Sequence, residues 1–331
     1  MISTLCKAAF FVHVNKYFST CDTKTTKVGE VEERFIQHIS EFGYSYGTQE
    51  EYSFRLSLFT EVDAELAKIN KKNTSFTVGH NFFSTLTKAE QKKRFGRKPN
   101  TEVNSVIMLK EKTAVTAIDW REKGAVNPVQ DQGQCGSCWA FSATAAMEGA
   151  HFIKTGTLLK HSEQQFVDCV KLSAGCNGGL EIRAFEYAMT NPQELETSYP
   201  YTAKTGKCSA DTSKEIVRVT GYANVAPKSV DELKNALANQ PTCVAVDASD
   251  NQFMYYTGGI LDTKTCGGAN PNLDHAITAV GYGTENGKGY FIVRNSWSAT
   301  WGEAGYIRMS SDVGGNGVCG VLMDASRPIT D

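Results

Sequence analysis

The chain has 331 residues, of which 41% are hydrophobic and 21% charged, so it is long enough to fold into more than one globular unit. Its formal net charge of −2 gives no reason to expect nucleic-acid binding, and no stretch reaches the roughly 18 consecutive apolar residues of a membrane span. The charge is unevenly placed: residues 1–113 hold 17 Lys or Arg and 13 Asp or Glu (net +4), and residues 114–331 hold 17 and 23 (net −6). These opposite signs predict that the first segment lies over the second.

Ten cysteines are present and eight of them follow residue 134, a clustering that favours disulfides and an oxidising or secretory compartment. The stretch from Leu5 to Val14 is mostly apolar and makes a weak signal-peptide core, with a cut near Ser19 to Cys21. The alternative is an ordinary buried N-terminal segment, and the cysteine content favours the signal.

Apolar residues recur with a helical period in two N-terminal stretches, Val28 to Phe42 and about Gln49 to Asn70, which Gly43 to Gly47 separates. Lys88 to Lys98 is a basic run, and such a run is more often a solvated face than a binding patch. Asn100 to Thr113 has little periodicity and is predicted to be an extended connector.

The stretch from Gln132 to Ser142 is the chemical centre of the chain. A helix is predicted from Trp139 to about Lys154, so Cys138 lies between a glycine-bearing loop and a helix N-terminus. The unpaired N–H groups and partial positive charge of that end stabilise a thiolate, so the pKa of the Cys138 thiol is expected to lie below that of a free cysteine. Gln132 is close enough through the loop to direct a side-chain N–H at the same place.

The rest of the chain changes from helical to strand-rich. Ser162 is placed to cap a short helix that runs toward Cys169, and Leu180 to Met189 is predicted to be helical again. The β-rich runs that follow are punctuated by Gly and Asn: Ile216–Val219, Cys243–Val246, Ile277–Val280, Tyr290–Val293 and Tyr306–Met309. This order predicts an α+β fold with two lobes that meet around residues 205–220.

A cysteine nucleophile needs a base within hydrogen-bond reach and a third group that orients the base. His275 is the candidate base, because the other five histidines lie in the N-terminal third or on or near the Cys138 helix. Asn295 follows the strand Tyr290–Val293, so its amide oxygen can accept from one imidazole nitrogen and leave the other facing sulfur. Trp297 is placed to shield that hydrogen bond from water.

Several motifs resemble papain-like cysteine proteases, and among them the cathepsin L-like group. The run Cys135-Gly136-Ser137-Cys138-Trp139 resembles the family's catalytic loop, and the separation of His275 from Cys138 falls in the family's range. The run Arg294-Asn295-Ser296-Trp297, followed by Trp301-Gly302-Glu303, resembles its C-terminal block. Ser298 stands where the family usually has Gly.

The N-terminal third resembles the inhibitory propeptides of the same group. Glu51, Arg55, Phe59 and Asn70 match an interspersed helical pattern of these propeptides, from which Val62 and Leu66 depart. Gly79 to Thr85 resembles a second propeptide element, in which Thr85 replaces an Asp. Asp119 to Val129 resembles the start of the mature enzyme, which a cut near Lys112 to Ala114 would release.

The resemblance implies a two-lobe fold with a helical left lobe and a β-barrel-like right lobe, preceded by a helical propeptide. The expected divisions are a signal peptide over 1–21, a propeptide over 22–113 and a peptidase over 114–331, with its mainly helical lobe at about 114–215 and its mainly β lobe at 216–331. The implied activity is that of a cysteine endopeptidase made as a zymogen and activated by propeptide removal at acidic pH. Cys138 and His275 would form a thiolate–imidazolium pair, Asn295 would orient His275, and Gln132 would help to hold the oxyanion.

Partners and compartment are implied in the same way. The expected partners are protein and peptide substrates, the chain's own propeptide as an intramolecular inhibitor, and cystatin-like inhibitors. We expect a monomer without a metal or other cofactor, without nucleic acid and without a membrane span. The expected location is a lysosome or digestive vacuole, or outside the cell after secretion.

By position, the resemblance also implies three disulfides, Cys135–Cys176, Cys169–Cys208 and Cys266–Cys319, and leaves Cys243 buried and inert in an apolar strand. It assigns substrate contacts to Gly178, Gly179, Leu180, Ala245, Leu273, Ala276 and Trp297, most of them around the pocket for the second residue before the cut. Asp324 aligns with the floor of this pocket and Glu181 lies near its entrance. Either both carboxylates face solvent, or Asp324 points inward and favours a cationic partner such as Arg.

Two other functions stay open. Cys135 and Cys138 form a C-x-x-C pair that would suit a thiol–disulfide oxidoreductase or half a zinc site, although no second such pair is present. A bridge between Cys135 and Cys176 would eliminate the oxidoreductase. The third interpretation is a catalytically silent homologue that binds proteins, but such a chain usually has a replaced nucleophile.

Overall fold

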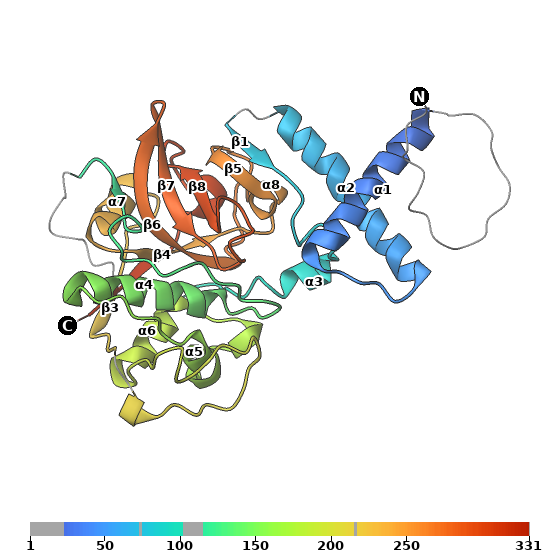
Figure 1. Cartoon of the computed structure of the whole chain (residues 1–331). Coiled ribbons are helices and arrows are strands. Elements are labelled where there is room, and N and C mark those ends of the chain that lie inside the picture. Colours follow the sequence, from blue (N-terminus) through green and yellow to red (C-terminus); the bar gives the residue numbers. More distant parts are fainter. Residues whose placement is uncertain (1–22, 73–74, 102–114, 215–216, 331) are drawn as a thin grey trace. The chain divides into compact units, whose positions relative to one another are not determined.

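The computed structural model describes residues 23–72, 75–101, 115–214 and 217–330 (Figure 1). Its internal contacts divide the chain into two compact units, Met1–Tyr46 and Gly47–Asp331. The expectations for a signal peptide over 1–21, for a cut near 112–114 and for most of the connector 100–113 fall outside the described residues.

The first unit contains helix α1 (Thr23–Phe42), which confirms the helix predicted from its apolar period. The helix ends at Gly43, which has a φ of +66°, a left-handed conformation that glycine adopts without strain. The Tyr44 N–H then donates to the Ile39 carbonyl over 3.0 Å and satisfies one of the last helical acceptors.

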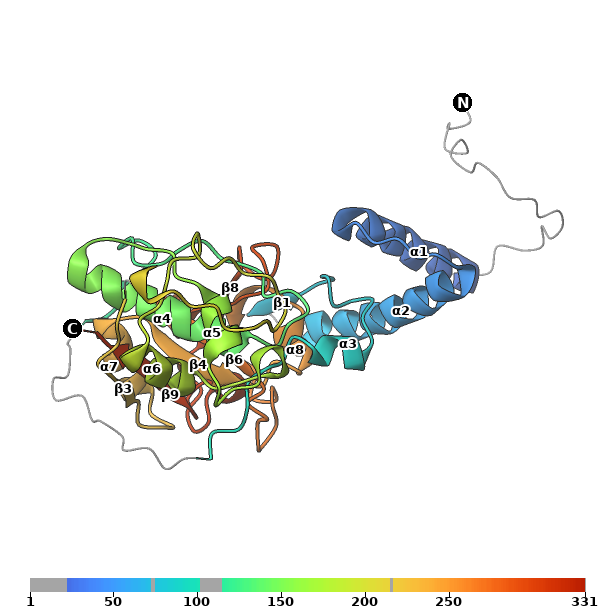
Figure 2. The same ribbon diagram turned by 90° about the horizontal axis from the view of Figure 1, so that it is seen from below.

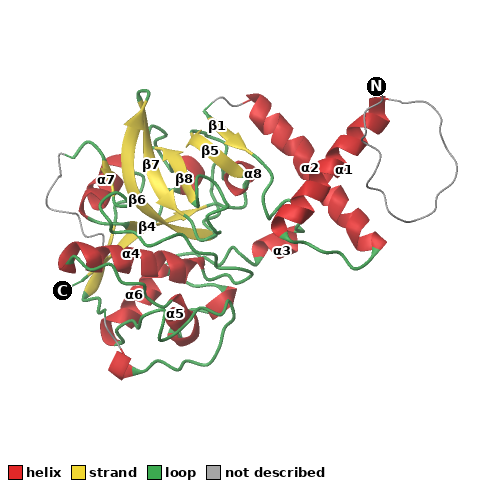
Figure 3. Ribbon diagram, in the orientation of Figure 1, coloured by secondary structure: helices red, strands yellow, loops and turns green. Residues whose placement is uncertain are grey.

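The second unit contains the remaining helices and, within the described residues, one nine-stranded sheet (Figure 3). The helices are α2 (Gln49–Lys72), α3 (Lys88–Lys92), α4 (Cys138–Thr155), α5 (Glu163–Cys169), α6 (Glu181–Thr190), α7 (Val230–Asn239) and α8 (Asn251–Met254). The strands are β1 (Phe76–Val78), β2 (Ile118–Asp119), β3 (Gly221–Asn224), β4 (Thr242–Val246), β5 (Tyr256–Leu261), β6 (His275–Glu285), β7 (Lys288–Arg294), β8 (Tyr306–Ser310) and β9 (Ala325–Ile329). They lie in the order β1-β5-β8-β7-β6-β4-β9-β3, and β2 pairs with β6.

Residues 47–101, which we call the N-terminal segment, are joined to the sheet. The Asn70 side chain joins the last turn of α2 to β1, because its amide donates to the Val78 carbonyl over 2.8 Å and its oxygen accepts from the Val78 N–H over 2.9 Å. This places β1 beside β5, where the two strands pair antiparallel. The N-terminal segment thereby adds a strand to the edge of a sheet whose other strands come from later in the chain.

Helix α4 is the packing centre of the second unit. Figures 1 and 2 show it between the sheet and the helices α5 and α6. Its small residues allow a close approach to β6, and Ser142 Oγ donates to the Ile277 carbonyl over 2.8 Å. The buried core around α4 consists of Cys138, Trp139, Ala140, Ala143, Ala146, Met147, Phe166, Val167, Val170, Ala184, Phe185, Ala188, Val217, Val219, Cys243 and Ala276.

The α+β class and the main elements are confirmed, including the cap at Ser162, whose oxygen accepts from the Gln165 N–H. The strand predicted at Ile216–Val219 is wrong over its described residues, 217–219, because Val217 makes only an isolated bridge to Gln193 and the strand β3 begins at Gly221. The three disulfides Cys135–Cys176, Cys169–Cys208 and Cys266–Cys319 are present, and Cys243 is a buried free thiol. None of the described helices is both long and apolar enough to cross a membrane.

The basic run Lys88–Lys98 is not simply a solvated face, which corrects the sequence interpretation. Arg94 and Arg97 are buried, with exposed fractions of 6% and 7%. Each arginine bonds a carboxylate of the later part of the chain: Arg94 contacts Asp131, and Arg97 contacts Glu181 and Asp324. Paired burial is the ordinary way in which a charged side chain enters an interior.

Candidate active site

Three elements bring the predicted nucleophile, base and orienting residue together. Cys138 is the first residue of α4, His275 is the first residue of β6, and Asn295 directly follows β7. Because β6 and β7 are antiparallel, the last residue of β7 lies near the start of β6 and brings Asn295 beside His275. The packing of α4 on β6 puts the Cys138 thiol at the same place, where the Ala276 N–H is directed at the sulfur.

The imidazole of His275 is held from two sides. Its Nε2 is 2.8 Å from Asn295 Oδ1, so Nε2 carries the proton that this oxygen accepts, and Nδ1 has no hydrogen-bond partner among the described residues. The indole of Trp297 stacks on the imidazole with centroids 4.5 Å apart, and it is fully buried. The hydrogen bond to Asn295 therefore fixes the tautomer of the His275 imidazole, and the Trp297 indole excludes water from that hydrogen bond.

Gln132 is equally well fixed. Its side-chain amide donates to the Cys135 carbonyl over 2.8 Å and to the Arg94 carbonyl over 2.9 Å. Ser296 Oγ donates to its Oε1 over 2.7 Å, and the Tyr201 hydroxyl donates to its backbone oxygen over 2.8 Å. Sequence reasoning missed Ser296 and Tyr201 as supports. Ser296 adjoins Asn295 and could have been suspected, whereas Tyr201 carries no local signal.

The prediction that the Cys138 thiol has a low pKa is wrong for the closed form of the chain, in which the N-terminal segment lies over the site. Burial raises the pKa of this thiol to about 12, although the N–H groups of Ala276 and Gly96 favour the thiolate. Burial also lowers the pKa of His275 to about 4, against the raising effect of its hydrogen bond to Asn295. Between these values both groups are neutral, because the low dielectric of the covered site opposes charge more than the helix N-terminus favours it.

Gly96 of the N-terminal segment covers the thiol. Its N–H is directed at the Cys138 sulfur, and a Cβ built on it would lie 1.8 Å from the Gly136 carbonyl oxygen. Only glycine can pass so close to the loop before α4. The backbone of the segment then pairs with Gly179, whose N–H donates to the Gly96 carbonyl over 2.9 Å and whose carbonyl accepts from the Lys98 N–H over 3.0 Å.

The residues assigned to the substrate pocket lie around the next side chain of the segment, Arg97. Its Nε donates to Glu181 Oε1 over 3.1 Å and its Nη2 donates to Asp324 Oδ2. Glu181 and Asp324 therefore both bond a cation, and Glu181 is 3% exposed, so the alternative that both carboxylates face solvent is wrong. Of the other predicted residues, Leu273 lines a pocket of about 330 Å³ with Arg97 and Asp324. Ala245, Ala276 and Leu180 do not line it and are buried in β4, in β6 and before α6.

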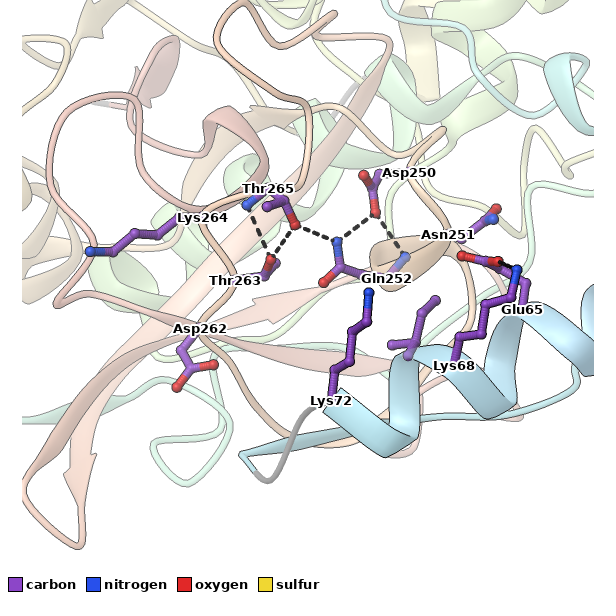
Figure 4. Close-up of a pocket in the computed structure, with 11 residues that line it drawn as sticks. Glu65, Lys68, Lys72, Asp250, Asn251, Gln252, Asp262, Thr263, Lys264 and Thr265 are labelled. Carbon is purple, nitrogen blue, oxygen red and sulfur yellow. Dashed lines mark hydrogen bonds and ion pairs between the residues drawn. The ribbon is translucent and has the colours of Figure 1, made fainter.

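A larger pocket, of about 570 Å³, lies elsewhere (Figure 4). It is lined by the end of α2 with Glu65, Lys68, Ile69 and Lys72, by Asp250, Asn251 and Gln252 around α8, and by Asp262, Thr263, Lys264 and Thr265 after β5. The close-up shows Lys72 extending from α2 toward Gln252, whose amide donates to Thr265. Because four of its eleven lining residues belong to α2, this pocket belongs to the contact between the N-terminal segment and the part of the chain that carries the sheet. Among the described residues, no group of three or more His, Cys, Asp or Glu is placed to hold a metal ion.

Comparison with known proteins decides the family. A family profile described as "Papain family cysteine protease" matches residues 114–329. The chain belongs to the papain family. It is 42% identical over 281 residues to germination-specific cysteine protease 1 of Arabidopsis thaliana, covering 80% of this chain and 74% of the relative. It is 40% identical over 301 residues to digestive cysteine proteinase 2 of Homarus americanus, covering 87% of this chain and 92% of the relative.

Solved structures agree over nearly the whole length. The recombinant stem bromelain precursor superposes with a TM-score of 0.83 at 37% identity, covering 91% of this chain and 99% of that one. Digestive procathepsin L2 proteinase from Tenebrio molitor larval midgut superposes with a TM-score of 0.84 at 33% identity, covering 90% of this chain and 99% of that one. The chain is thus a cysteine protease, a hydrolase, with the fold of a papain-family precursor. The Cys135–Cys176 bridge eliminates the oxidoreductase that would use Cys135 and Cys138.

Proposed function

We propose that the chain is the precursor of a cysteine endopeptidase in which Cys138 is the nucleophile and His275 the general acid and base. The observation that carries this proposal is the meeting of four side chains at the N-terminus of α4: Cys138, His275, Asn295 and Gln132. Asn295 holds His275, and a fifth side chain, that of Ser296, holds Gln132. All four residue types that the chemistry needs are present, which argues against a catalytically silent binding protein.

The chemistry follows from these positions. Once the site opens, the thiol proton passes to His275 Nδ1, and the Cys138 sulfur attacks a peptide carbonyl carbon. The negative charge that develops on the carbonyl oxygen is stabilised by the Cys138 backbone N–H and the Gln132 amide, and loss of one such donor costs roughly 3 to 4 kcal/mol in other proteases. His275 then protonates the leaving amine. Water, deprotonated by His275, attacks the thioester carbon and releases the acyl group with the thiol restored.

Residues 22–113 act as the inhibitory propeptide in this proposal, and residues 114–331 as the peptidase, with lobes at about 114–215 and 216–331. Two contacts support inhibition. In the first, the Arg94 carbonyl accepts a hydrogen bond from the Gln132 side-chain amide, which would otherwise stabilise the oxyanion. In the second, Gly96 covers the Cys138 thiol. Residues 1–21 are proposed to be the signal peptide. Three disulfides favour passage through an oxidising compartment.

Acid activation is supported by the opposite net charges of the two segments, +4 over residues 1–113 and −6 over residues 114–331. We expect the attraction between them to weaken as carboxylates bind protons below roughly pH 5.

Labelling with an epoxide inhibitor of thiol proteases tests the proposal. The full chain is treated with the inhibitor at neutral pH, with and without prior incubation at acidic pH, and the adduct is located by peptide mass spectrometry. We expect an adduct on Cys138 only after acid treatment and none in Cys138→Ser. Labelling at another cysteine, or none under any condition, would contradict the assignment.

Endopeptidase action is supported by the absence of histidine between Cys176 and His275, because carboxypeptidase-type relatives carry a histidine-bearing loop there. Digestion of a long peptide blocked at both ends should give internal fragments. Trimming by dipeptides from the C-terminus alone would refute it. The relatives named digestive cysteine proteinases support our proposal of a lysosome, a digestive vacuole or secretion as the location. We also propose a monomer that acts on proteins and peptides and is blocked by cystatin-like inhibitors.

A further inference from the structure

The hydroxyl of Tyr201 joins the two ends of the loop that leads into α4. It donates to the Gln132 backbone carbonyl over 2.8 Å, and its oxygen lies 2.6 Å from Ser137 Oγ. A phenol has one proton, and the Gln132 carbonyl receives it because a carbonyl oxygen can only accept. Ser137 Oγ therefore donates to the Tyr201 oxygen, and the three groups form one chain of hydrogen bonds that polarise one another.

Each end of this chain of hydrogen bonds carries a donor that the proposed reaction uses. Gln132 supplies its side-chain amide, and Ser137 directly precedes Cys138, so Ser137 shares a peptide unit with the Cys138 N–H. Ser137 is also the N-cap of α4, yet its side chain makes no cap hydrogen bond. A serine at this position usually accepts from its own helix. Here its printed hydrogen bond goes to Tyr201 instead, outside the helix that it begins.

Tyr201 is itself held in place by the helices around it. Its backbone N–H donates to Glu196 Oε1 over 2.9 Å, and the N–H of the next residue, Thr202, donates to Gln164 Oε1 of α5 over 2.8 Å. Its ring meets Phe141 of α4 edge-on, with centroids 4.8 Å apart. Because the backbone and the ring are both fixed, the hydroxyl is a fixed point to which the loop before α4 is tied.

These hydrogen bonds do not depend on the N-terminal segment or on pH in the working range. Gln132, Ser137 and Tyr201 all lie within residues 114–331, so removal of the segment takes away none of the three partners. Burial raises the pKa of the Tyr201 hydroxyl above its usual 10, so the phenol keeps its proton under acidic and neutral conditions. The Tyr201 hydroxyl therefore remains a donor to Gln132 while the protease acts.

We propose that Tyr201 is a positioning residue of the oxyanion site: by tying Ser137 to Gln132, it sets the distance between the two donors that stabilise the charge on the substrate's carbonyl oxygen. This inference rests on the proposed function. A misplacement of about 1 Å can cost a hundredfold in rate, so a hydroxyl that does not touch the substrate can still control the reaction. The loss is expected in kcat and not in KM, because the charge on the oxygen develops only toward the transition state.

The test compares two reactions of Cys138 in the acid-processed chain. Hydrolysis of a peptide needs the oxyanion donors, whereas alkylation by iodoacetamide displaces iodide from a saturated carbon and puts no charge on a carbonyl oxygen. Tyr201→Phe removes the hydroxyl and keeps the ring. We expect its kcat for the peptide to fall about ten- to a hundredfold with KM nearly unchanged, and its alkylation rate to stay within about twofold of wild type. Gln132→Ala is the reference for a lost donor, with hydrolysis roughly a hundred- to a thousandfold slower and alkylation unchanged.

Tyr199→Phe is the matched control. Tyr199 lies in the same stretch of the chain, and its hydroxyl donates to Asp168 Oδ2 over 2.9 Å and not to the loop before α4. Its loss should leave both rates of the folded enzyme close to those of wild type. Ser137→Ala breaks the chain of hydrogen bonds at its other end and should reproduce the pattern of Tyr201→Phe. Because both substitutions remove one and the same connection, the double variant should lose no more than about the larger single effect.

The outcomes separate this inference from the proposed function. If Tyr201→Phe hydrolyses the peptide at the wild-type rate, or if hydrolysis and alkylation fall by the same factor, the positioning role is wrong and the protease assignment stands. If the processed wild-type chain hydrolyses no peptide and Cys138 is not alkylated, the proposed function is wrong and this inference falls with it. If Tyr201→Phe fails to fold, Ser137→Ala decides the question through the same pair of rates.

Discussion

The aromatic contact that holds the N-terminal segment on the catalytic part offers a quantitative test. Phe83 is fully buried, and its ring packs edge-on against Trp297 with centroids 4.8 Å apart. The Phe95 ring lies 6.2 Å from the Phe83 ring, between centroids, and the Arg94 guanidinium lies 5.9 Å from the Phe83 centroid. Because Trp297 also covers His275, the substitution Phe83→Ala removes one of the segment's aromatic side chains that pack against the active site, beside Phe82 and Phe95.

The expected size of the effect follows from burial. Truncation of a buried Phe to Ala costs roughly 3 to 5 kcal/mol, and an edge-to-face pair accounts for about 0.5 to 1.5 kcal/mol of such a loss. Phe83 also packs on Phe82 and Phe95 within the segment, so part of the loss weakens the segment itself and part weakens its docking. Both losses favour the open form. A shift of about 3 kcal/mol would raise the open fraction by roughly two orders of magnitude.

Epoxide labelling of Cys138 at neutral pH, followed by mass spectrometry over time, measures the open fraction through the labelling rate. We expect Phe83→Ala to be labelled roughly a hundredfold faster than wild type. Phe54→Ala is the matched control, because Phe54 lies on α2 with 45% of its surface exposed and should change the rate little. Equal rates for Phe83→Ala and Phe54→Ala would refute the reasoning.

Two further predictions concern individual hydrogen bonds. Asn295→Ala frees the His275 imidazole to turn, so kcat should fall about a hundredfold with KM nearly unchanged in steady-state kinetics, and an effect on KM alone would contradict the orienting role. Arg55 holds the pKa of Glu90 at about 2, below its usual 4.5, so this pair stabilises the precursor above pH 4.5 and the gain is lost as pH falls through about 2. Thermal unfolding should therefore show a lower Tm for Glu90→Gln than for wild type at pH 6 and no difference near pH 2; a constant difference would exclude this ion pair as the cause.

Sequence patterns predicted those helices and strands whose own residues carry the apolar pattern that their position in the fold requires. The helices α1, α2 and α4 carry an apolar period or a small-residue face, and each formed where it was expected. The strands β5 and β9 were missed, because the glycines of Tyr256–Leu261 and the polar and proline residues of Ala325–Ile329 weaken a β pattern. Both strands form through pairing with partners far away in the chain, which no local window contains.

The active site divides in a similar way. Cys138, His275 and Asn295 were found because their residue types and flanking motifs are specific to one chemistry. The role of Arg97 was not predicted, because a basic run looks solvated until its carboxylate partners, 84 and 227 residues away, are placed beside it. The direction of the Cys138 pKa was wrong for a similar reason: the helix N-terminus is a local feature, whereas the burial that outweighs it arises only when distant parts of the chain pack around the thiol.

The central claim is that one pair of side chains is neutral and covered in the precursor and becomes a thiolate and an imidazolium after release. The rate at which iodoacetamide alkylates Cys138 between pH 4 and pH 8, in the precursor and in the acid-processed chain, tests this claim directly, because only the thiolate reacts. We predict no alkylation of Cys138 in the precursor at neutral pH, where burial raises the pKa of its thiol to about 12, and a nearly constant rate in the processed chain from about pH 5 to pH 8. A processed chain that reacts only as its pH approaches about 8.5, the pKa of a free cysteine, would contradict the account.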